Sequence, residues 1–303
     1  MPTPPNDRAS PLRLGLPKGR MQRGVLDLLG SAGIRVTMSE RGYRPRVSLE
    51  GTEAKILKPQ NIIEMLHAGS RDLGFAGADW VRELGYDTES PGGVVEVLDT
   101  GLDAVRLVAA APRDMLDETG TLRPKPGNKI RIAAEMVRLT GEWIARAGID
   151  AEIVRTYGAT EVFPPEDADA VVDIAASGDT LRANGLHVFD ELHRSTTRLY
   201  ANAEALADPD RRDRIDQIVV LLRSVLEARD RAMLDMNVAH DALEAVVDAL
   251  PAMRDPTVAP LRGDAGYAVR AAVPRAALTE LIPALRARGA TDLVVTTPTQ
   301  IVR

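Results

Sequence analysis

Residues 168–181 read Ala-Asp-Ala-Val-Val-Asp-Ile-Ala-Ala-Ser-Gly-Asp-Thr-Leu. The apolar residues around Asp173 predict a short strand, and the segment that follows predicts a turn into a helix. Such a turn directs several backbone N–H groups to one place, and the hydroxyl groups of Ser177 and Thr180 add two donors there. The stretch therefore predicts a phosphate-binding turn in an α/β fold. An ordinary capped strand-to-helix turn is the alternative.

Asp173 stands at the end of this strand. Its carboxylate cannot hold a phosphate, but it can accept hydrogen bonds from vicinal sugar hydroxyls or bind a metal ion through water. No P-loop lysine accompanies the turn. An acid beside a phosphate cradle therefore indicates a phosphorylated sugar rather than a nucleoside triphosphate.

Strands and helices alternate on both sides of this stretch. Strands are predicted at residues 12–16, 56–57, 73–76, 94–98, 104–111, 129–133, 151–155 and 199–202. Helices are predicted between them, such as the one that carries Val25, Leu28 and Leu29 and closes at Gly33. This alternation is typical of α/β domains with mostly parallel sheets, and the nearly all-apolar strand at 104–111 is expected to be central.

The rhythm of the chain changes after a long amphipathic helix predicted over residues 210–230. Next come a strand at 232–238, a helix at 242–250, strands at 257–261 and 267–273, a helix at 278–288 and a strand at 293–297. The order βαββαβ is the ferredoxin-like or ACT-type pattern of a small domain.

Composition excludes several classes of protein. The 303 residues are 45% hydrophobic and lack a long apolar run, which indicates a globular protein without a membrane partner. The formal charge of −6 argues against a nucleic-acid partner. The absence of Cys excludes disulfides and thiolate nucleophiles. The polar, Pro-rich start lacks a signal-peptide pattern, so we expect a cytoplasmic location.

Two further turns carry candidate binding residues. Pro17-Lys18-Gly19-Arg20 places two cations after a strand, where Lys18 and Arg20 can neutralise phosphates, unless the turn is simply solvated. Residues 72–79, Asp-Leu-Gly-Phe-Ala-Gly-Ala-Asp, predict a strand that leaves through small residues, where a ligand can approach the backbone. Glycine at strand ends is also common without a ligand.

Two more segments have two possible interpretations each. Residues 41–46, Arg-Gly-Tyr-Arg-Pro-Arg, form a basic cluster in which Arg44 can contact a nucleotide or belong to an exposed loop. In Gly158-Ala159-Thr160-Glu161, the acid can face a ligand, or Thr160 can cap a helix whose dipole Glu161 complements.

Residues 173–186 resemble the 5-phosphoribosyl 1-pyrophosphate (PRPP) loop of phosphoribosyltransferases, and their end, Thr-Leu-Arg-Ala-Asn-Gly-Leu, is similar to the ATP phosphoribosyltransferase family. Three other segments resemble sequence motifs of that family and occur in the same order along the chain. They are the Pro-Lys-Gly-Arg turn, residues 72–79 and Gly-Ala-Thr-Glu. Met236-Asn237-Val238, Leu250-Pro251 and Gly289-Ala290 resemble the regulatory domain of its long form. The segment between Glu161 and Asp173 departs from the family, because it is about one residue short.

The resemblance implies a fold and an activity. The fold is a two-domain core like a type II periplasmic binding protein, with domain I at 1–105 plus 195–225, domain II at 106–194 and a regulatory domain at 226–303. The activity transfers the phosphoribosyl group of PRPP to N1 of the adenine of ATP, releases pyrophosphate and opens L-histidine biosynthesis. Mg²⁺ as cofactor, L-histidine as inhibitor and a homo-oligomer, dimer or hexamer, are implied as well.

The resemblance also implies residue roles. The implied catalytic residues are Lys18, Arg20, Glu161 and Asp173; Asp173, Ser177, Gly178, Asp179, Thr180 and Leu181 would bind PRPP; and Lys18, Arg20, Arg44, Asp72, Gly77 and Asp79 would bind ATP. No general base is required, because N1 of adenine has a free lone pair.

Two other functions remain open. A type I salvage phosphoribosyltransferase would use the same loop, but its usual pair of adjacent acids is missing, since Ile174 follows Asp173. A non-catalytic small-molecule binding protein of the same two-domain fold normally carries a secretion signal, and none is recognised here.

Overall fold

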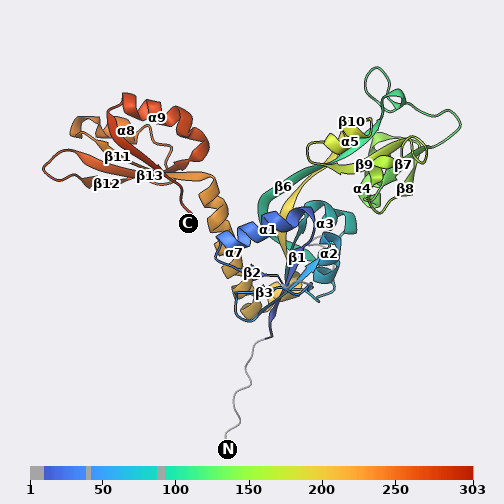
Figure 1. The fold of residues 1–303 in the computed structure, drawn as a ribbon, viewed down its shortest axis with the longest axis horizontal. Helices are drawn as coiled ribbons and strands as arrows, with labels where there is room; N and C mark the ends of the chain where they lie inside the picture. The colour runs from blue at the N-terminus through green and yellow to red at the C-terminus, as the bar shows by residue number, and fades with distance from the viewer. Residues whose placement is uncertain (1–9, 39–41, 87–92, 303) are drawn as a thin grey trace, which may run out of the picture. The chain divides into compact units, whose positions relative to one another are not determined.

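The computed structural model of the chain describes residues 10–38, 42–86 and 93–302. It divides into two compact units, Met1–Asp27 with Ile34–Asp216, and Leu28–Gly33 with Gln217–Arg303 (Figure 1). Among the described residues, no helix is both long and apolar enough to cross a membrane.

A single mixed sheet forms the centre of the first unit. Its eight strands lie in the order β4-β1-β5-β10-β6-β9-β7-β8. Their bounds are β1 Leu12–Pro17, β4 Thr52–Leu57, β5 Leu73–Gly77, β6 Val94–Pro112, β7 Ile130–Ala134, β8 Ala151–Arg155, β9 Ala170–Ala175 and β10 Leu186–Asn202. The predicted α/β class is confirmed, and β6 is central as expected.

The expectation of a mostly parallel arrangement needs correction. Strand β1 pairs in parallel with β4 and β5, and β7 pairs in parallel with β8 and β9. In the middle of the sheet, however, β10 runs antiparallel to β5 and β6, and β6 runs antiparallel to β9. The chain passes from one parallel group to the other and back through these strands.

Two strands are longer than the sequence predicts. Strand β6 is one strand of 19 residues where two were expected, and β10 begins at Leu186 rather than at Leu199. The two strands pair side by side from Leu186 opposite Pro112 to Asn202 opposite Val94, with irregular register between (Figure 1). Gly101 and Asp103 have positive φ values inside β6, so this part of the strand looks like a turn in sequence.

Helices connect or follow these strands, and all but the short helix at Ala203–Ala207 stand where the sequence predicts a helix. They are α1 Arg20–Ser31, α2 Pro59–His67, α3 Ala78–Leu84, α4 Val137–Ala147, α5 Asp179–Ala183, α6 Ala203–Ala207 and α7 Pro209–Arg229. Helix α2 shows how tightly they pack: a Cβ at Gly74 of β5 would lie 2.5 Å from Ile62 Cγ2. The glycine is therefore required by the close approach of α2 to the sheet.

Four short elements complete the first unit. Strands β2 Val36–Thr37 and β3 Arg46–Val47 pair in a small antiparallel ladder. The 3₁₀ turns η1 Arg113–Met115 and η2 Thr160–Val162 follow β6 and β8.

The second unit is a four-stranded antiparallel sheet with two helices. Its elements are β11 Arg231–Val238, η3 His240–Ala242, α8 Leu243–Val247, β12 Thr257–Pro260, β13 Tyr267–Pro274, η4 Arg275–Ala277, α9 Leu278–Ala287 and β14 Ala290–Thr296, with sheet order β12-β13-β11-β14. Leu234, Val246, Val269 and Leu285 belong to its core. The predicted order of elements, βαββαβ, is confirmed.

Candidate active site

The predicted phosphate cradle is the turn that joins β9 to α5. Gly178 stands at this junction with φ +79°, in the left-handed region that favours glycine. Ser177 Oγ donates a hydrogen bond to Asp179 Oδ2 at 2.5 Å, and Arg182 pairs with the same carboxylate. Arg182 also donates to the carbonyl of Ser177 at 3.1 Å. These bonds hold the turn in shape before any ligand arrives.

The hydrogen bond from Ser177 and the charge of Arg182 also hold the pKa of Asp179 below its ordinary value. The side chains of Ser177, Asp179 and Thr180 are exposed, so a ligand can reach them. Leu181 differs, because its side chain is 2% exposed and packs in a core cluster with Val171 and Leu186. Only the backbone of Leu181 can therefore face a phosphate.

Asp173 lies near the end of β9 and is half-buried. The backbone N–H of Ile174 donates to Asp173 Oδ1 at 2.7 Å. Burial is the main reason that the pKa of Asp173 rises to about 6, and the negative charges of Glu161 and Glu135 raise it further. Such a carboxylate is costly to keep ionised without a ligand.

Glu161 belongs to η2, and its charge acts on Asp173. The alternative role of Thr160 as a helix cap is not what the structure shows. Ala159 precedes η2 with φ +49° and no side-chain cap is formed, while the hydroxyl of Thr160 lies 2.8 Å from that of Thr156.

Sequence reasoning missed Glu135, which directly follows β7. Its position after a strand that neighbours β9 was a usable signal, because parallel strands end at the same edge.

Lys18 and Arg20 follow the end of β1, as predicted, and both are exposed. Arg20 Nη1 donates to the carbonyl of Asp103 at 2.9 Å. No hydrogen bond or ion pair among the described residues joins this turn to the phosphate cradle. The positive charge of Arg20 does act on Asp79.

Asp79 lies in the first turn of α3, the helix that follows β5, and is 1% exposed. Ser195 of β10 donates to Asp79 Oδ1 at 3.0 Å, whereas Asp79 Oδ2 is buried without a hydrogen-bond partner. Burial raises the pKa of this carboxyl group. Gly77 makes the arrangement possible, since a Cβ there would lie 2.0 Å from Asp79 Oδ1.

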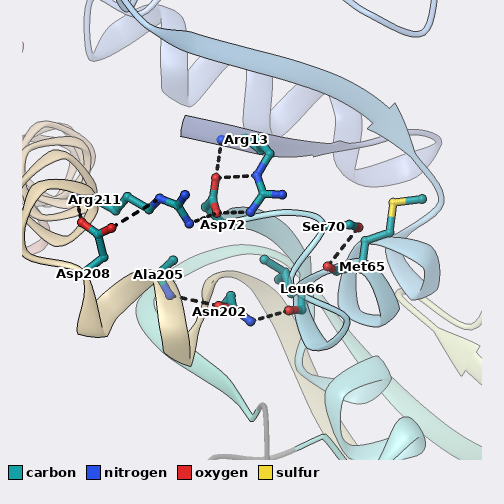
Figure 2. Close-up of polar contacts among 9 residues, drawn as sticks. All are labelled: Arg13, Met65, Leu66, Ser70, Asp72, Asn202, Ala205, Asp208 and Arg211. Atoms are coloured by element: carbon teal, nitrogen blue, oxygen red, sulfur yellow. Dashed lines mark hydrogen bonds and ion pairs between the residues drawn. The ribbon is translucent and has the colours of Figure 1, made fainter. Parts of the chain in front are cut away.

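Asp72 lies at the opposite, amino-terminal end of β5, where two arginines bind its carboxylate (Figure 2). Its carboxylate accepts from the backbone N, Nε and Nη2 of Arg13 at 2.7, 3.0 and 2.6 Å, and from Arg211 Nη1 at 3.3 Å. Buried hydrogen bonds with Arg13 and the charges of both arginines outweigh desolvation and lower the pKa of Asp72. Both of its oxygens are thus already engaged.

Arg44 is exposed in the segment before β3, and its neighbour in the predicted basic cluster, Arg41, lies outside the described residues.

A cavity of about 380 Å³ in the first unit is lined by residues from two parts of the candidate site. Ala176, which precedes the phosphate cradle, and Ser195, the partner of Asp79, both line it. Arg106, Arg194 and Arg198 also line it, and sequence reasoning named none of them. A larger cavity, about 570 Å³, lies against α3 and α4 and contains none of the predicted site residues.

Two acids of the candidate site, Asp173 and Glu161, could face a metal ion. Among the described residues, no group of three or more His, Asp or Glu side chains has a metal-binding arrangement. Mg²⁺ typically uses one or two carboxylates together with substrate phosphates rather than a cage made only of protein. The neighbouring carboxylates of Asp173 and Glu161 fit that mode of binding.

Comparison with known proteins agrees with this geometry. A family model described as ATP phosphoribosyltransferase matches residues 58–224, and one described as the HisG C-terminal domain matches residues 228–298. The ATP phosphoribosyltransferase of Pelotomaculum thermopropionicum is 37% identical over 284 residues, covering 93% of this chain and 96% of that protein. The enzyme of that name from Chlorobium luteolum is 34% identical over 284 residues, covering 92% and 93%.

A solved structure is similar in fold to the greater part of the chain. The ATP phosphoribosyl transferase (HisG:HisZ) complex from Thermotoga maritima contains a chain that is 24% identical, with a TM-score of 0.59, over 71% of this chain and 98% of that one. With sequence relatives above 30% identity along nearly the whole length, the chain belongs to the ATP phosphoribosyltransferase family.

Proposed function

We propose that this chain is a pentosyltransferase that joins C1 of the ribose of PRPP to N1 of the adenine of ATP and releases pyrophosphate, the first step of L-histidine biosynthesis. The observation that carries this proposal is the ordered turn at Ser177–Thr180 beside the half-buried Asp173. Together they offer donors for a phosphate and an acceptor for sugar hydroxyls. Family membership supports the same reaction.

PRPP would bind with its 5-phosphate on the cradle. The backbone N–H groups from Gly178 to Leu181 and the hydroxyl of Thr180 would donate to the phosphate oxygens. Asp173 would accept hydrogen bonds from the ribose hydroxyls. Such bonds favour the ionised carboxylate, so ligand binding would lower the raised pKa of Asp173.

ATP would bind near the carboxyl ends of β1 and β5. Lys18 and Arg20 would neutralise phosphates, and Arg44 would add a third cation. Gly77 would allow close approach to the backbone, and Asp79 would hold Ser195 of β10 in position. Asp72 is left out of this assignment, because its carboxylate is occupied by Arg13 and Arg211.

In the reaction, one bond to C1 of the ribose forms while another bond to C1 breaks. The lone pair of adenine N1 forms the new bond to C1, and the electrons of the C1–O bond leave with pyrophosphate. Positive charge develops on the ribose, where the carboxylates of Asp173 and Glu161 would stabilise it. Cationic residues would stabilise the departing pyrophosphate. The protein therefore acts by positioning and by electrostatics, without a general base.

Mg²⁺ is proposed as the cofactor. When bound, it would neutralise the pyrophosphate group, and Asp173 and Glu161 are the residues proposed to face it.

The direct test is incubation of the purified chain with ATP, PRPP and Mg²⁺. We expect mass spectrometry to find the N1-ribosylated nucleotide and one pyrophosphate per product. A salvage enzyme would consume PRPP only with a free base, and a binding protein would consume none. PRPP binding without product would contradict the proposal.

The finer features of the fold are also proposed. They are a periplasmic-binding-protein-like core with domain I at 1–105 plus 195–225 and domain II at 106–194, followed by an ACT-type regulatory domain at 226–303. Support for the last comes from the antiparallel order β12-β13-β11-β14 of the second unit. The proposed location is the cytoplasm.

L-Histidine is the proposed inhibitor, and the second unit offers a place for it. One face of its sheet has a cavity of about 520 Å³ lined by Asp235, Asn237, Arg270 and Asp292, among others. Carboxylates and a guanidinium together suit the ammonium and carboxylate groups of a free amino acid. A ligand there inhibits only by binding one global state more tightly, and a hundredfold preference corresponds to about 2.7 kcal/mol.

Inhibition kinetics of the full-length chain test this site. Asp292→Asn should weaken inhibition by histidine at least about tenfold and leave the KM values for ATP and PRPP unchanged. Unaltered sensitivity to histidine would place the regulatory site elsewhere.

A homo-oligomer, dimer or hexamer, is the proposed assembly. The Thermotoga maritima relative is a complex of HisG with HisZ, whereas the present chain carries its own C-terminal unit. Light scattering of the purified protein would give the number of subunits, and a monomer at micromolar concentration would contradict the proposal.

A further inference from the structure

Three cations from separate segments lie together in the first unit, outside the phosphate cradle. Lys55 is in β4, opposite Gly15 of β1. The backbone N–H of Ile56 donates to the carbonyl of Tyr43 at 2.8 Å, which places the neighbouring Arg44 beside the same strand. Arg71 precedes β5, the strand on the other side of β1. We refer to Arg44, Lys55 and Arg71 as the cation cluster.

Arg71 is the unusual member of the cation cluster. Its side chain is 8% exposed, and its Nε atom is buried without a hydrogen-bond partner. No ion pair of Arg71 occurs among the described residues. Buried polar groups are normally satisfied, and an unpaired buried charge is among the most costly features a protein can contain. Arg71 therefore requires an explanation.

The charges of Asp72 and Glu53 act favourably on Arg71, but neither acid forms an ion pair with it among the described residues. Asp72, the next residue, has its carboxylate bound by Arg13 and Arg211 (Figure 2). Glu53 lies close enough to act on Arg71 electrostatically but forms no ion pair with it.

The cations of the cluster also act on one another. The positive charge of Arg71, and to a smaller extent that of Arg44, lowers the pKa of Lys55. The pKa of Arg71 is lowered mainly by burial and, after that, by the positive charge of Arg13. Neither Lys55 nor Arg44 forms an ion pair within the described part of the chain. Three mutually repelling cations with a buried, unpaired member are what an anion-binding site shows when it holds no anion.

We propose that the cation cluster binds a phosphate-bearing anion at a site separate from the cradle between β9 and α5. Arginine forks and a lysine ammonium together match several phosphate oxygens, and the bound anion would supply the partner that Arg71 Nε lacks. Two sources offer this chemistry: free pyrophosphate or phosphate, and the phosphate chain of ATP. The second source would rest on the proposed function, and the first would not.

Isothermal titration with inorganic pyrophosphate, without PRPP, tests the site independently of catalysis. The pyrophosphate binding that is lost in Thr180→Ala is binding at the cradle, and the binding that this variant keeps is assigned to other sites. We expect Lys55→Met and Arg71→Met each to weaken the remaining binding at least about tenfold, since charge-assisted contacts are lost. Lys129→Met, which removes an exposed lysine before β7, should bind like the wild type.

A second titration with ATP separates the two sources. An equal loss of ATP affinity in Lys55→Met would identify the phosphate chain of ATP as the occupant, and unchanged ATP affinity would identify a free phosphate anion. The proposal is overturned if wild type and Lys55→Met bind both pyrophosphate and ATP equally.

Folding of the variants is checked by thermal unfolding in anion-free buffer. Arg71→Met should unfold at the same temperature as the wild type or higher, because it removes an uncompensated buried charge. Phosphate should raise the unfolding temperature of the wild type more than that of Arg71→Met. If Arg71→Met does not fold, the outcome for Lys55→Met decides alone.

Discussion

Replacing Asp173 with asparagine should stabilise the ligand-free protein while it weakens the use of PRPP. The pKa of Asp173 is raised from 3.8 to about 6, mainly by burial. A carboxyl group with a raised pKa favours the folded state below its unfolded pKa, and this benefit disappears as pH rises through the folded pKa. The difference of about two units corresponds to about 3 kcal/mol of lost stability above pH 7.

Asparagine keeps the oxygen that accepts from Ile174 but carries no charge to desolvate. The gain in unfolding free energy should therefore be about 3 kcal/mol at pH 8. It should be below about 1 kcal/mol at pH 4, where the folded-state side chain is protonated and the unfolded-state side chain is only about half ionised. Urea unfolding of wild type and Asp173→Asn at the two pH values measures this difference.

Glu161→Gln supplies a control for the origin of the effect. The negative charge of Glu161 raises the pKa of Asp173, so its removal should lower that pKa and reduce the gain from Asp173→Asn at pH 8. PRPP kinetics complete the test, because kcat/KM should fall in Asp173→Asn despite the higher stability. A gain that is equal at pH 4 and pH 8, or a loss of stability at pH 8, would refute the reasoning.

Three other substitutions test the remaining assignments. Thr180→Ala should lower kcat/KM for PRPP roughly a hundredfold, about 2–3 kcal/mol, with unchanged thermal unfolding; unchanged PRPP kinetics would remove Thr180 from the cradle. Asp72→Asn should cost about 2 kcal/mol of stability in urea unfolding and leave the KM for ATP unchanged, whereas a raised KM in an equally stable protein would restore its role at the nucleotide. Gly77→Ala should destabilise the chain by about 1–3 kcal/mol, because its Cβ would overlap Asp79; wild-type stability would show that this carboxylate moves freely.

Local patterns were sufficient where one short stretch makes the whole feature. Residues 168–181 predict the strand, the turn and the helix at the correct places, because strand, glycine and helix start follow one another in the chain. The closure of α1 at Gly33 is of the same kind, since a positive φ at that position favours glycine.

The centre of the sheet was harder to predict, because its strands depend on partners far away in sequence. The residues before Leu199 are mostly polar and show no apolar alternation, yet they form a strand since β6 pairs with them along its length. Gly101 and Asp103 have positive φ values, which are typical of turns, and the sequence therefore predicts two strands where the structure has the single strand β6. Pairing between distant segments overrides local preference in both cases.

The contrast between Asp72 and Asp79 shows what a motif cannot supply. Both acids belong to one eight-residue pattern, and both were assigned to ATP from the sequence. Strand β5 runs between them and carries each to an opposite edge of the sheet. Asp72 there meets two arginines from distant segments, which lower its pKa and engage both of its oxygens.

Asp79, in contrast, meets the hydroxyl of Ser195 and an apolar environment that raises its pKa and leaves one oxygen unpaired. Identical side chains seven positions apart thus have pKa values shifted in opposite directions, because the fold gives them different neighbours. Arg71 completes the argument. Arg13 and Arg211 engage the carboxylate of Asp72, and Arg71 beside it has no ion pair within the described part of the chain and a buried Nε atom without a hydrogen-bond partner. The ion pairs of Asp72 with Arg13 and Arg211 and the proposed anion site at Arg71 thus have the same cause: this end of β5 carries more arginines than carboxylates that can pair with them.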